Sequence, residues 1–166
     1  MPTSPPLPVD FRGVFRADLP ARAVYAEAAG IGRALPCAVA VPADAADVVA
    51  LVRWAAATAT PLVPRGAGSS MGGGAIGTGV IVDLSRNATL GAVAADARRV
   101  WAGPGVAGAA VDAAARAHGL RFPVDPSSWR FSSVGGMTAC NAAGAHSLRH
   151  GAMRPWVTAL DCVFAD

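Results

Sequence analysis

The sequence has 166 residues, of which 53% are hydrophobic and 15% are charged, a composition that excludes a disordered chain and allows a buried core. Its net charge of +3 is the difference between 14 basic and 11 acidic residues. The basic residues are all arginine and lie scattered along the chain. Nucleic-acid binding usually requires a clustered basic patch, so no nucleic-acid partner is expected. No apolar run reaches the ~18 residues of a transmembrane helix, and no signal-peptide pattern begins the sequence. We therefore expect a cytoplasmic protein.

The residues that commonly bind metals or form disulfides show no matching pattern. Cys37, Cys140 and Cys162 lack C-x-x-C spacing and do not pair evenly, so we expect buried free thiols in a reducing compartment. His146 and His150 are four residues apart, but no third ligand accompanies them. No metal site is expected.

The first half of the chain has the pattern of a βαβ unit. Residues 1–10 contain four prolines and predict a loose segment, and residues 18–29 predict a short helix. A strand is predicted at residues 37–41, and another at residues 61–64. The helix between these strands begins at Asp44, whose carboxylate is suited to an N-cap. Strands joined in this way run parallel, and ligand loops follow their carboxyl ends.

A glycine-rich loop follows the strand at residues 61–64 and precedes a further strand at residues 80–84. Glycines let backbone amides converge on an anion, and small hydroxyls assist them. The chain has no lysine for a Walker loop, and Met71 stands where a dinucleotide-binding fingerprint has its third glycine. A phosphate cradle of another type is therefore predicted, with a ligand-free surface loop as the alternative. The loop residues are Pro64, Arg65, Gly66, Ala67, Gly68, Ser69, Ser70 and Gly73.

The second half of the chain contains another segment of small residues. Short strands are predicted at residues 90–95 and 99–102, a helix at residues 107–118, and a final strand at residues 157–165. Between the helix and the final strand, residues 122–144 combine prolines, serines and glycines, with a short helix predicted from Val134 to Asn141. Two such segments in one chain suggest an extended ligand that is contacted at two places.

Together the two segments resemble the cofactor-binding motifs of FAD-linked oxidases of the vanillyl-alcohol oxidase type. The first motif is Pro64–Ser70 with Gly73, and the second comprises residues 125–128, 133–136 and 141–144. Residues 145–151 are most similar to the branch that carries an iron–sulfur domain and is related to D-2-hydroxyglutarate and D-lactate dehydrogenases. The resemblance implies an α+β fold, a PCMH-type FAD-binding domain over residues 11–166. This domain would have an N-terminal βαβ lobe and most of a second mixed α/β lobe, truncated at the C-terminus.

The resemblance also implies roles for individual residues. Backbone amides of Arg65–Ser70 would hold the FAD pyrophosphate, and the Arg65 side chain would contact a phosphate rather than neutralise a surface carboxylate. Ser69 stands where relatives with covalent FAD often have histidine, so FAD is expected to bind non-covalently. The residues expected to line the flavin and its ribityl chain are Asp125, Pro126, Ser127, Ser128, Ser133, Gly135, Gly136, Thr138 and Asn141.

The expected function is that of an FAD-binding domain in an oxidoreductase that oxidises a D-2-hydroxy acid of the lactate or 2-hydroxyglutarate type. In the family, catalytic residues come from a cap domain that this sequence lacks, so none is assigned. A downstream cap or iron–sulfur polypeptide is an expected partner. Two alternatives stay open: a flavin-binding module or split-enzyme fragment without independent catalysis, and a truncated product without function.

Overall fold

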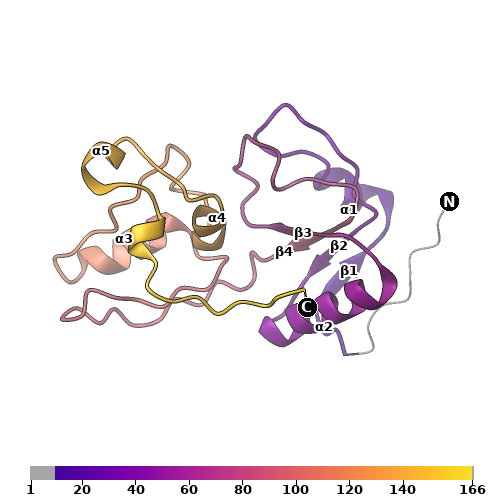
Figure 1. The fold of residues 1–166 in the computed structure, drawn as a ribbon, viewed down its shortest axis with the longest axis horizontal. Coiled ribbons are helices and arrows are strands. Elements are labelled where there is room, and N and C mark those ends of the chain that lie inside the picture. The colour runs from indigo at the N-terminus through magenta and orange to yellow at the C-terminus, as the bar shows by residue number, and fades with distance from the viewer. Residues whose placement is uncertain (1–9, 166) are drawn as a thin grey trace. The chain divides into compact units, whose positions relative to one another are not determined.

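The computed structural model of the protein describes residues 10–165 (Figure 1). These residues form two compact units. The first unit runs as far as Arg86 and includes the segment that begins at Asp161, and the second runs from Asn87 to Leu160. The loose segment predicted for residues 1–10 lies outside the described residues, except for Asp10, which is exposed.

The first unit is built on a four-stranded sheet. Its strands are β1 (Val14–Arg16), β2 (Ala38–Val41), β3 (Leu62–Arg65) and β4 (Val80–Asp83), in the order β1-β2-β4-β3. Both β2 and β3 pair with β4 in parallel, whereas β1 pairs with β2 antiparallel. The predicted βαβ unit is therefore present with parallel strands, but β4 lies between them.

Helix α2 (Ala45–Thr58) covers one face of this sheet. Alternate residues of β2 and β4 point toward it, because successive side chains of a strand face opposite sides. The resulting core contains Leu51 and Trp54, and Phe15 meets the Trp54 ring edge-on with centroids 6.1 Å apart. The other buried members of this core are Ala38, Ala40, Ala55, Val80 and Val82.

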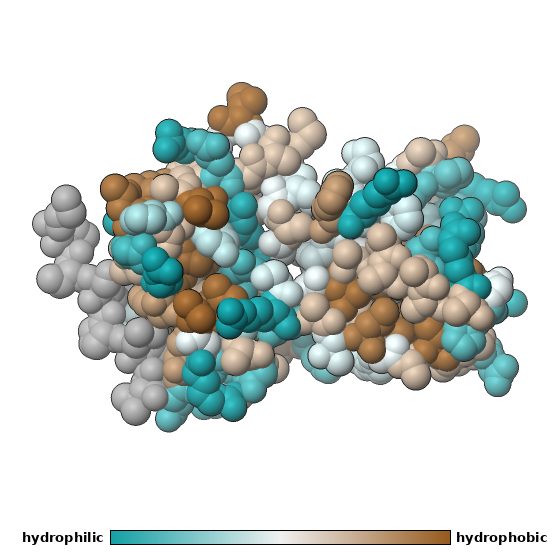
Figure 2. All heavy atoms as spheres, turned by 180° about the vertical axis from the view of Figure 1, so that it is seen from behind, coloured by the Kyte–Doolittle hydropathy of each residue, from teal (hydrophilic) through white to brown (hydrophobic). Residues whose placement is uncertain are grey.

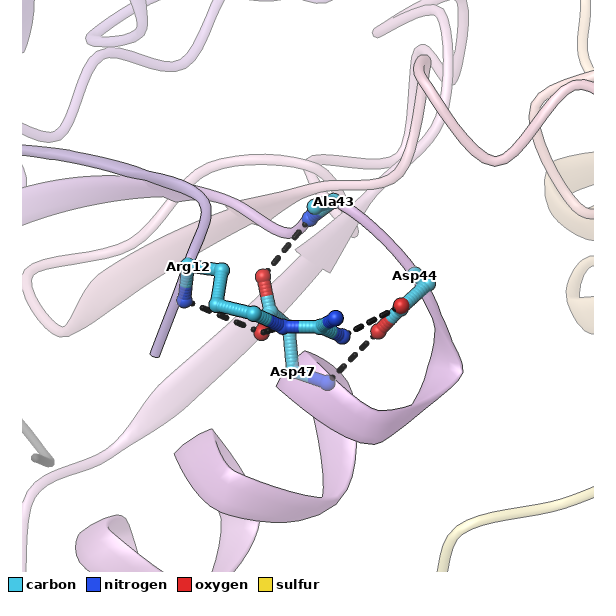
Figure 3. A network of polar contacts seen from close by, with 4 residues as sticks. All are labelled: Arg12, Ala43, Asp44 and Asp47. Atoms are coloured by element: carbon cyan, nitrogen blue, oxygen red, sulfur yellow. Dashed lines mark hydrogen bonds and ion pairs between the residues drawn. The ribbon is translucent and has the colours of Figure 1, made fainter. Parts of the chain in front are cut away.

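The start of α2 is fixed by two aspartates (Figure 3). Asp44 is the N-cap, as predicted, and accepts a hydrogen bond from the Asp47 amide at 3.1 Å. The fully buried Asp47 carboxylate accepts from the Ala43 amide at 2.8 Å and from the Arg12 amide at 3.1 Å. The Arg12 guanidinium also contacts both aspartates. This network ties the chain before β1 to the helix.

Helix α1 (Leu19–Val24) is shorter than the predicted 18–29. Asp18 caps it by accepting from the Ala21 amide at 3.2 Å. After Val24 the chain tightens, because the Tyr25 amide bonds to Arg22 O, and it then leaves the helix. The residues that follow run along the glycine-rich loop instead of continuing the helix.

The second unit has little regular structure. It contains α3 (Gly108–Arg116), α4 (Val134–Ala139), α5 (Ser147–His150) and the 3₁₀ turn η1 (Arg154–Trp156). Its core consists of Val124, Met137 and Met153. The helices predicted at residues 107–118 and from Val134 to Asn141 are confirmed, each slightly shorter. The strands predicted at 90–95 and 99–102 are reduced to two single bridges, because only Leu90–Ala102 and Ala94–Arg99 pair.

The strand predicted at residues 157–165 is wrong. The segment forms no ladder with any described residue, and residues 158–165 are exposed. An apolar alternating sequence becomes a strand only where a neighbour supplies hydrogen-bond partners, and here none of the described residues does.

Burial of the cysteines was also predicted wrongly, because all three are exposed free thiols. Cys37 directly precedes β2 and Cys140 follows α4, so each lies at the end of an element. Apolar groups reach the surface of both units (Figure 2), and large exposed ones include Ile31, Met71 and Leu148. Among the described residues, no helix has the length and apolar content needed to cross a membrane.

Candidate functional site

The glycine-rich loop leaves the carboxyl end of β3, where the βαβ pattern places it. Gly68 is buried and has a φ of +69°, a conformation that other residues rarely adopt. Within the described chain, no acceptor pairs with the amide N–H groups of residues 66–70. Consecutive free amides in a turn form a concave site for an anion.

The Arg65 side chain lies within the first unit and bonds to the backbone. Its Nη1 donates to Glu27 O and to Ala75 O, each at 3.0 Å. Its guanidinium carbon lies 5.2 Å from the centroid of the Tyr25 ring, a cation–π distance. The guanidinium thus joins β3 to the far end of the glycine loop and to the chain after α1.

Tyr25 is itself fixed by the end of β4. Its hydroxyl donates to Asp83 Oδ2 at 2.5 Å, and Asp83 pairs in register with Arg65. Burial and the hydrogen bond to the Asp83 carboxylate raise the pKa of Tyr25 to about 12. No motif in the sequence points to Tyr25, Glu27 or Asp83, because their contacts with the loop and with each other span long distances in the chain.

The second predicted segment is organised around Asp125. His146 Nδ1 lies 2.5 Å from Asp125 Oδ2, and the His146 amide donates to Asp125 Oδ1 at 3.3 Å. These hydrogen bonds lower the pKa of Asp125 against the opposing effect of its desolvation. Gly144 packs so closely that an added Cβ would lie 2.1 Å from Asp125 O. Gly144 and His146 therefore both pack against Asp125, a contact that the sequence did not reveal.

Helix α4 carries three of the predicted residues and a fourth is its N-cap, and its first amides are already bonded within the protein. Ser133 caps the helix by accepting from the Gly136 amide at 3.3 Å. The Gly135 amide donates to Pro104 O at 3.0 Å, and a Cβ on Gly135 would lie 2.6 Å from Pro104. Packing against Pro104 accounts for glycine at position 135. Thr138, in the last turn, is half-buried.

The remaining predicted residues hold the loops of the second unit. Ser128 O accepts from the Ser132 amide at 2.8 Å and from its hydroxyl at 3.0 Å. Asn141 has a φ of +48°, and its Oδ1 accepts from the Arg154 amide at 2.8 Å. Pro126 O accepts from the Trp129 amide at 2.8 Å, and Ser127 is exposed. Most of the predicted residues of the second segment thus take part in hydrogen bonds within the second unit.

A family model described as an FAD binding domain matches residues 36–166. The chain belongs to this FAD-binding domain family. The match includes the glycine loop and the whole second segment, so the resemblance drawn from the two motifs is confirmed. The free amides of residues 66–70 fit the cofactor, because the pyrophosphate of FAD presents two negative charges to N–H donors.

Two curated relatives match most of this chain. A D-lactate dehydrogenase of Archaeoglobus fulgidus is 37% identical over 127 residues, covering 75% of this chain and 28% of that protein. A D-2-hydroxyglutarate dehydrogenase of Xanthomonas citri pv. viticola is 38% identical over 131 residues, covering 77% of this chain and 28% of that protein. The chain therefore spans about 28% of the length of these relatives.

Solved structures share the fold of this FAD-binding domain. An alkyldihydroxyacetonephosphate synthase matches with a TM-score of 0.74 at 22% identity, covering 85% of this chain and 31% of that one. The 6-hydroxy-D-nicotine oxidase of Arthrobacter nicotinovorans matches with a TM-score of 0.72 at 20% identity, covering 89% and 32%. The predicted PCMH-type α+β fold is thus confirmed.

Proposed function

We propose that the chain binds FAD non-covalently, with the pyrophosphate at the loop Pro64–Gly73. The observation that carries this proposal is the run of five backbone amides, residues 66–70, that find no acceptor in the described chain. The flavin and ribityl chain would contact the segment from Asp125 to Asn141. Ser69 offers a hydroxyl and no imidazole for a covalent tether, which supports a dissociable cofactor. Residues 11–166 would act as one FAD-binding domain.

We further propose that this domain belongs to an oxidoreductase that acts on a D-2-hydroxy acid. The names of the relatives that are 37% and 38% identical support this substrate class. Bound FAD would supply the acceptor for the substrate hydride, as cofactors carry the redox chemistry of such enzymes. The residues of this chain would hold and orient FAD. The proton of the substrate hydroxyl would be taken by residues of a cap or iron–sulfur polypeptide beyond these 166.

The cofactor proposal is tested by titrating the purified 166-residue chain with FAD and following flavin fluorescence. Saturable binding is expected, followed by complete release of flavin into the supernatant after acid precipitation. Flavin that stays with the precipitate would contradict non-covalent binding. Gly68→Ala should weaken binding, because its φ is positive and its Cβ would lie 2.5 Å from Arg65 Nη2. Gly74→Ala is the matched control, because nothing lies within 4 Å of its Cβ position.

The substrate proposal needs a second experiment. The FAD-loaded chain is mixed without oxygen with D-lactate or D-2-hydroxyglutarate, alone and with the polypeptide encoded directly downstream. Loss of the oxidised flavin absorbance only with the downstream polypeptide would support the proposed division of labour. If flavin is bound but neither substrate reduces it in either mixture, the chain is a flavin-binding module without this activity.

A further inference from the structure

The guanidinium of Arg65 lies inside the turn of the glycine loop. Gly68 is buried with a φ of +69°, and a Cβ built on it would lie 2.5 Å from Arg65 Nη2 and 2.8 Å from Cζ. The Gly68 carbonyl accepts from the Ala29 amide at 3.0 Å. The turn is therefore packed against the guanidinium on one side and bonded to the chain after α1 on the other.

Both hydrogen bonds of Arg65 Nη1 go to carbonyls that flank the loop. Ala75 O, at 3.0 Å, lies at the end of the glycine run, and Glu27 O, also at 3.0 Å, lies in the segment after α1. The same segment packs on the loop a second time, because a Cβ on Gly30 would lie 2.3 Å from Met71 O. Arg65 thus bridges the two ends of the glycine loop and bonds the loop to the segment after α1.

The Arg65 guanidinium also packs against Tyr25. The Tyr25 ring lies 5.2 Å from Arg65 Cζ, and its hydroxyl is bonded to Asp83 on the adjacent strand. Nη1 bonds the two carbonyls while the rest of the planar group meets the Tyr25 ring and Gly68, and the compact ammonium of lysine has no such plane. The contacts with Ala75 O and Gly68 therefore constrain the loop directly, whereas Glu27 O and Tyr25 hold the guanidinium itself.

From these contacts we infer that Arg65 is a positioning residue, which orders the free amides of residues 66–70 for a diphosphate through the loop backbone and not by touching the phosphates. This inference rests on the proposed FAD site. It changes the role expected from the sequence, in which the Arg65 side chain itself contacts a phosphate. Charge alone would then be insufficient, and the shape of the guanidinium would be essential.

The test compares Arg65→Lys, Arg65→Gln and Arg33→Gln in the 166-residue chain. Arg33 is the matched control, because its side chain is 70% exposed and pairs with Glu27 on the same segment at 3.4 Å. Amide hydrogen exchange of Ala29, whose N–H is bonded to Gly68 O in the loop, is measured by NMR without FAD, and dissociation constants are measured for FAD, ADP and riboflavin. In both Arg65 variants the Ala29 amide should exchange faster, and FAD and ADP should bind about 10-fold more weakly, the effect of losing bonds to a charged group. Riboflavin, which has no pyrophosphate, and the Arg33 variant should show no change.

The inference is overturned if Arg65→Lys binds FAD within about threefold of the parent, because retained charge would then suffice. Unchanged exchange of the Ala29 amide in Arg65→Gln would overturn it as well. Unfolding of both Arg65 variants while Arg33→Gln stays folded would also overturn the inference, because loss of a residue that orders only the loop should leave the sheet folded. If the parent chain binds no FAD, the proposed function fails, while the exchange comparison in the FAD-free chain still decides the role of Arg65.

Discussion

Tyr25 donates its hydroxyl to Asp83 Oδ2 at 2.5 Å, although 58 residues separate the two in the chain. The bond joins the residue that ends α1 to the last residue of β4. Asp83 is 9% exposed and also accepts from the Ser85 amide at 2.8 Å. The position of the Tyr25 ring under Arg65, and with it the geometry of the glycine loop, thus depends on the sheet.

The first prediction concerns the ionisation of Tyr25, which is the single tyrosine of the sequence. Burial and the Asp83 carboxylate raise its pKa to about 12. The folded chain therefore binds the phenolic proton more tightly than the unfolded chain, whose tyrosine titrates at about pH 10. The stability from this pair is fully present below about pH 10 and is lost as the pH rises toward about 12.

Phenolate absorbance against pH, in the native chain and in denaturant, measures this difference directly. The native midpoint should lie well above the denatured one. Asp83→Asn should lower the native midpoint, because the hydrogen bond to an anion and its charge are removed while burial stays. Equal midpoints in the native and denatured chains would contradict the bond between Tyr25 and Asp83.

The second prediction concerns Asp47, which is fully buried. Asp47→Ala removes the acceptor of the Ala43 and Arg12 amides, so it should lower the free energy of unfolding by about 2 kcal/mol. Urea denaturation followed by circular dichroism measures this loss. Asp96→Ala, at an exposed position, should stay within about 0.5 kcal/mol of the parent. Equal effects of the two substitutions would exclude a structural role for the Asp47 network.

The same carboxylate predicts sensitivity to acid. Desolvation opposes its ionisation, but hydrogen bonds from the Ala43 and Arg12 amides and the Arg12 charge outweigh this effect, so the pKa of Asp47 is lowered. An unfolded aspartate titrates at about pH 3.9. The contribution of Asp47 to stability is therefore present above that pH and is lost as the pH falls through the lower folded pKa. The parent should therefore lose more stability below about pH 4 than Asp47→Ala does.

The third prediction concerns Gly144. A Cβ at this position would lie 2.1 Å from Asp125 O and 2.4 Å from Asp125 Oδ1, so the backbone must move. Gly144→Ala should lower the free energy of unfolding by about 1 to 3 kcal/mol, as overpacking does. Gly74→Ala, with open space around its Cβ position, should leave stability unchanged. Thermal unfolding of the two variants makes the comparison, and an unaffected Gly144→Ala would show that the Asp125 loop is not held as described.

The sequence predicted best those features that depend on neighbouring residues. The helix cap at Asp44 with Asp47 three residues later is local, and α2 begins where it indicates. The insertion of β4 between β2 and β3 depends on pairing between distant segments, which no local pattern specifies. The alternating residues 157–165 favour a strand, but a strand also needs a neighbour to pair with. Helix α1 ends early for a related reason, because the chain after Tyr25 bonds to the glycine loop.

The candidate site divides in the same way. Glycines and serines made the loop at residues 64–73 visible, because backbone freedom and small hydroxyls belong to the residue types themselves. The residues that hold the loop were missed, since Tyr25 and Asp83 become neighbours only through the sheet. The spacing of His146 and His150 does not indicate the contact of His146 with Asp125. Supporting residues carry no motif of their own.

The fourth prediction separates two roles of Asn141. Its φ of +48° is tolerated by asparagine, and its Oδ1 accepts from the Arg154 amide at 2.8 Å. Asn141→Asp keeps both properties and should melt like the parent. Asn141→Gly keeps the backbone freedom but loses the bond, and Asn141→Ala loses both, with a cost of about 1 to 2 kcal/mol. Melting temperatures should therefore fall in the order aspartate, glycine, alanine. If the Asn141 amide contacts the cofactor, Asn141→Asp should bind FAD more weakly despite its unchanged melting temperature. If FAD affinity instead follows stability across the three variants, Asn141 has a structural role alone.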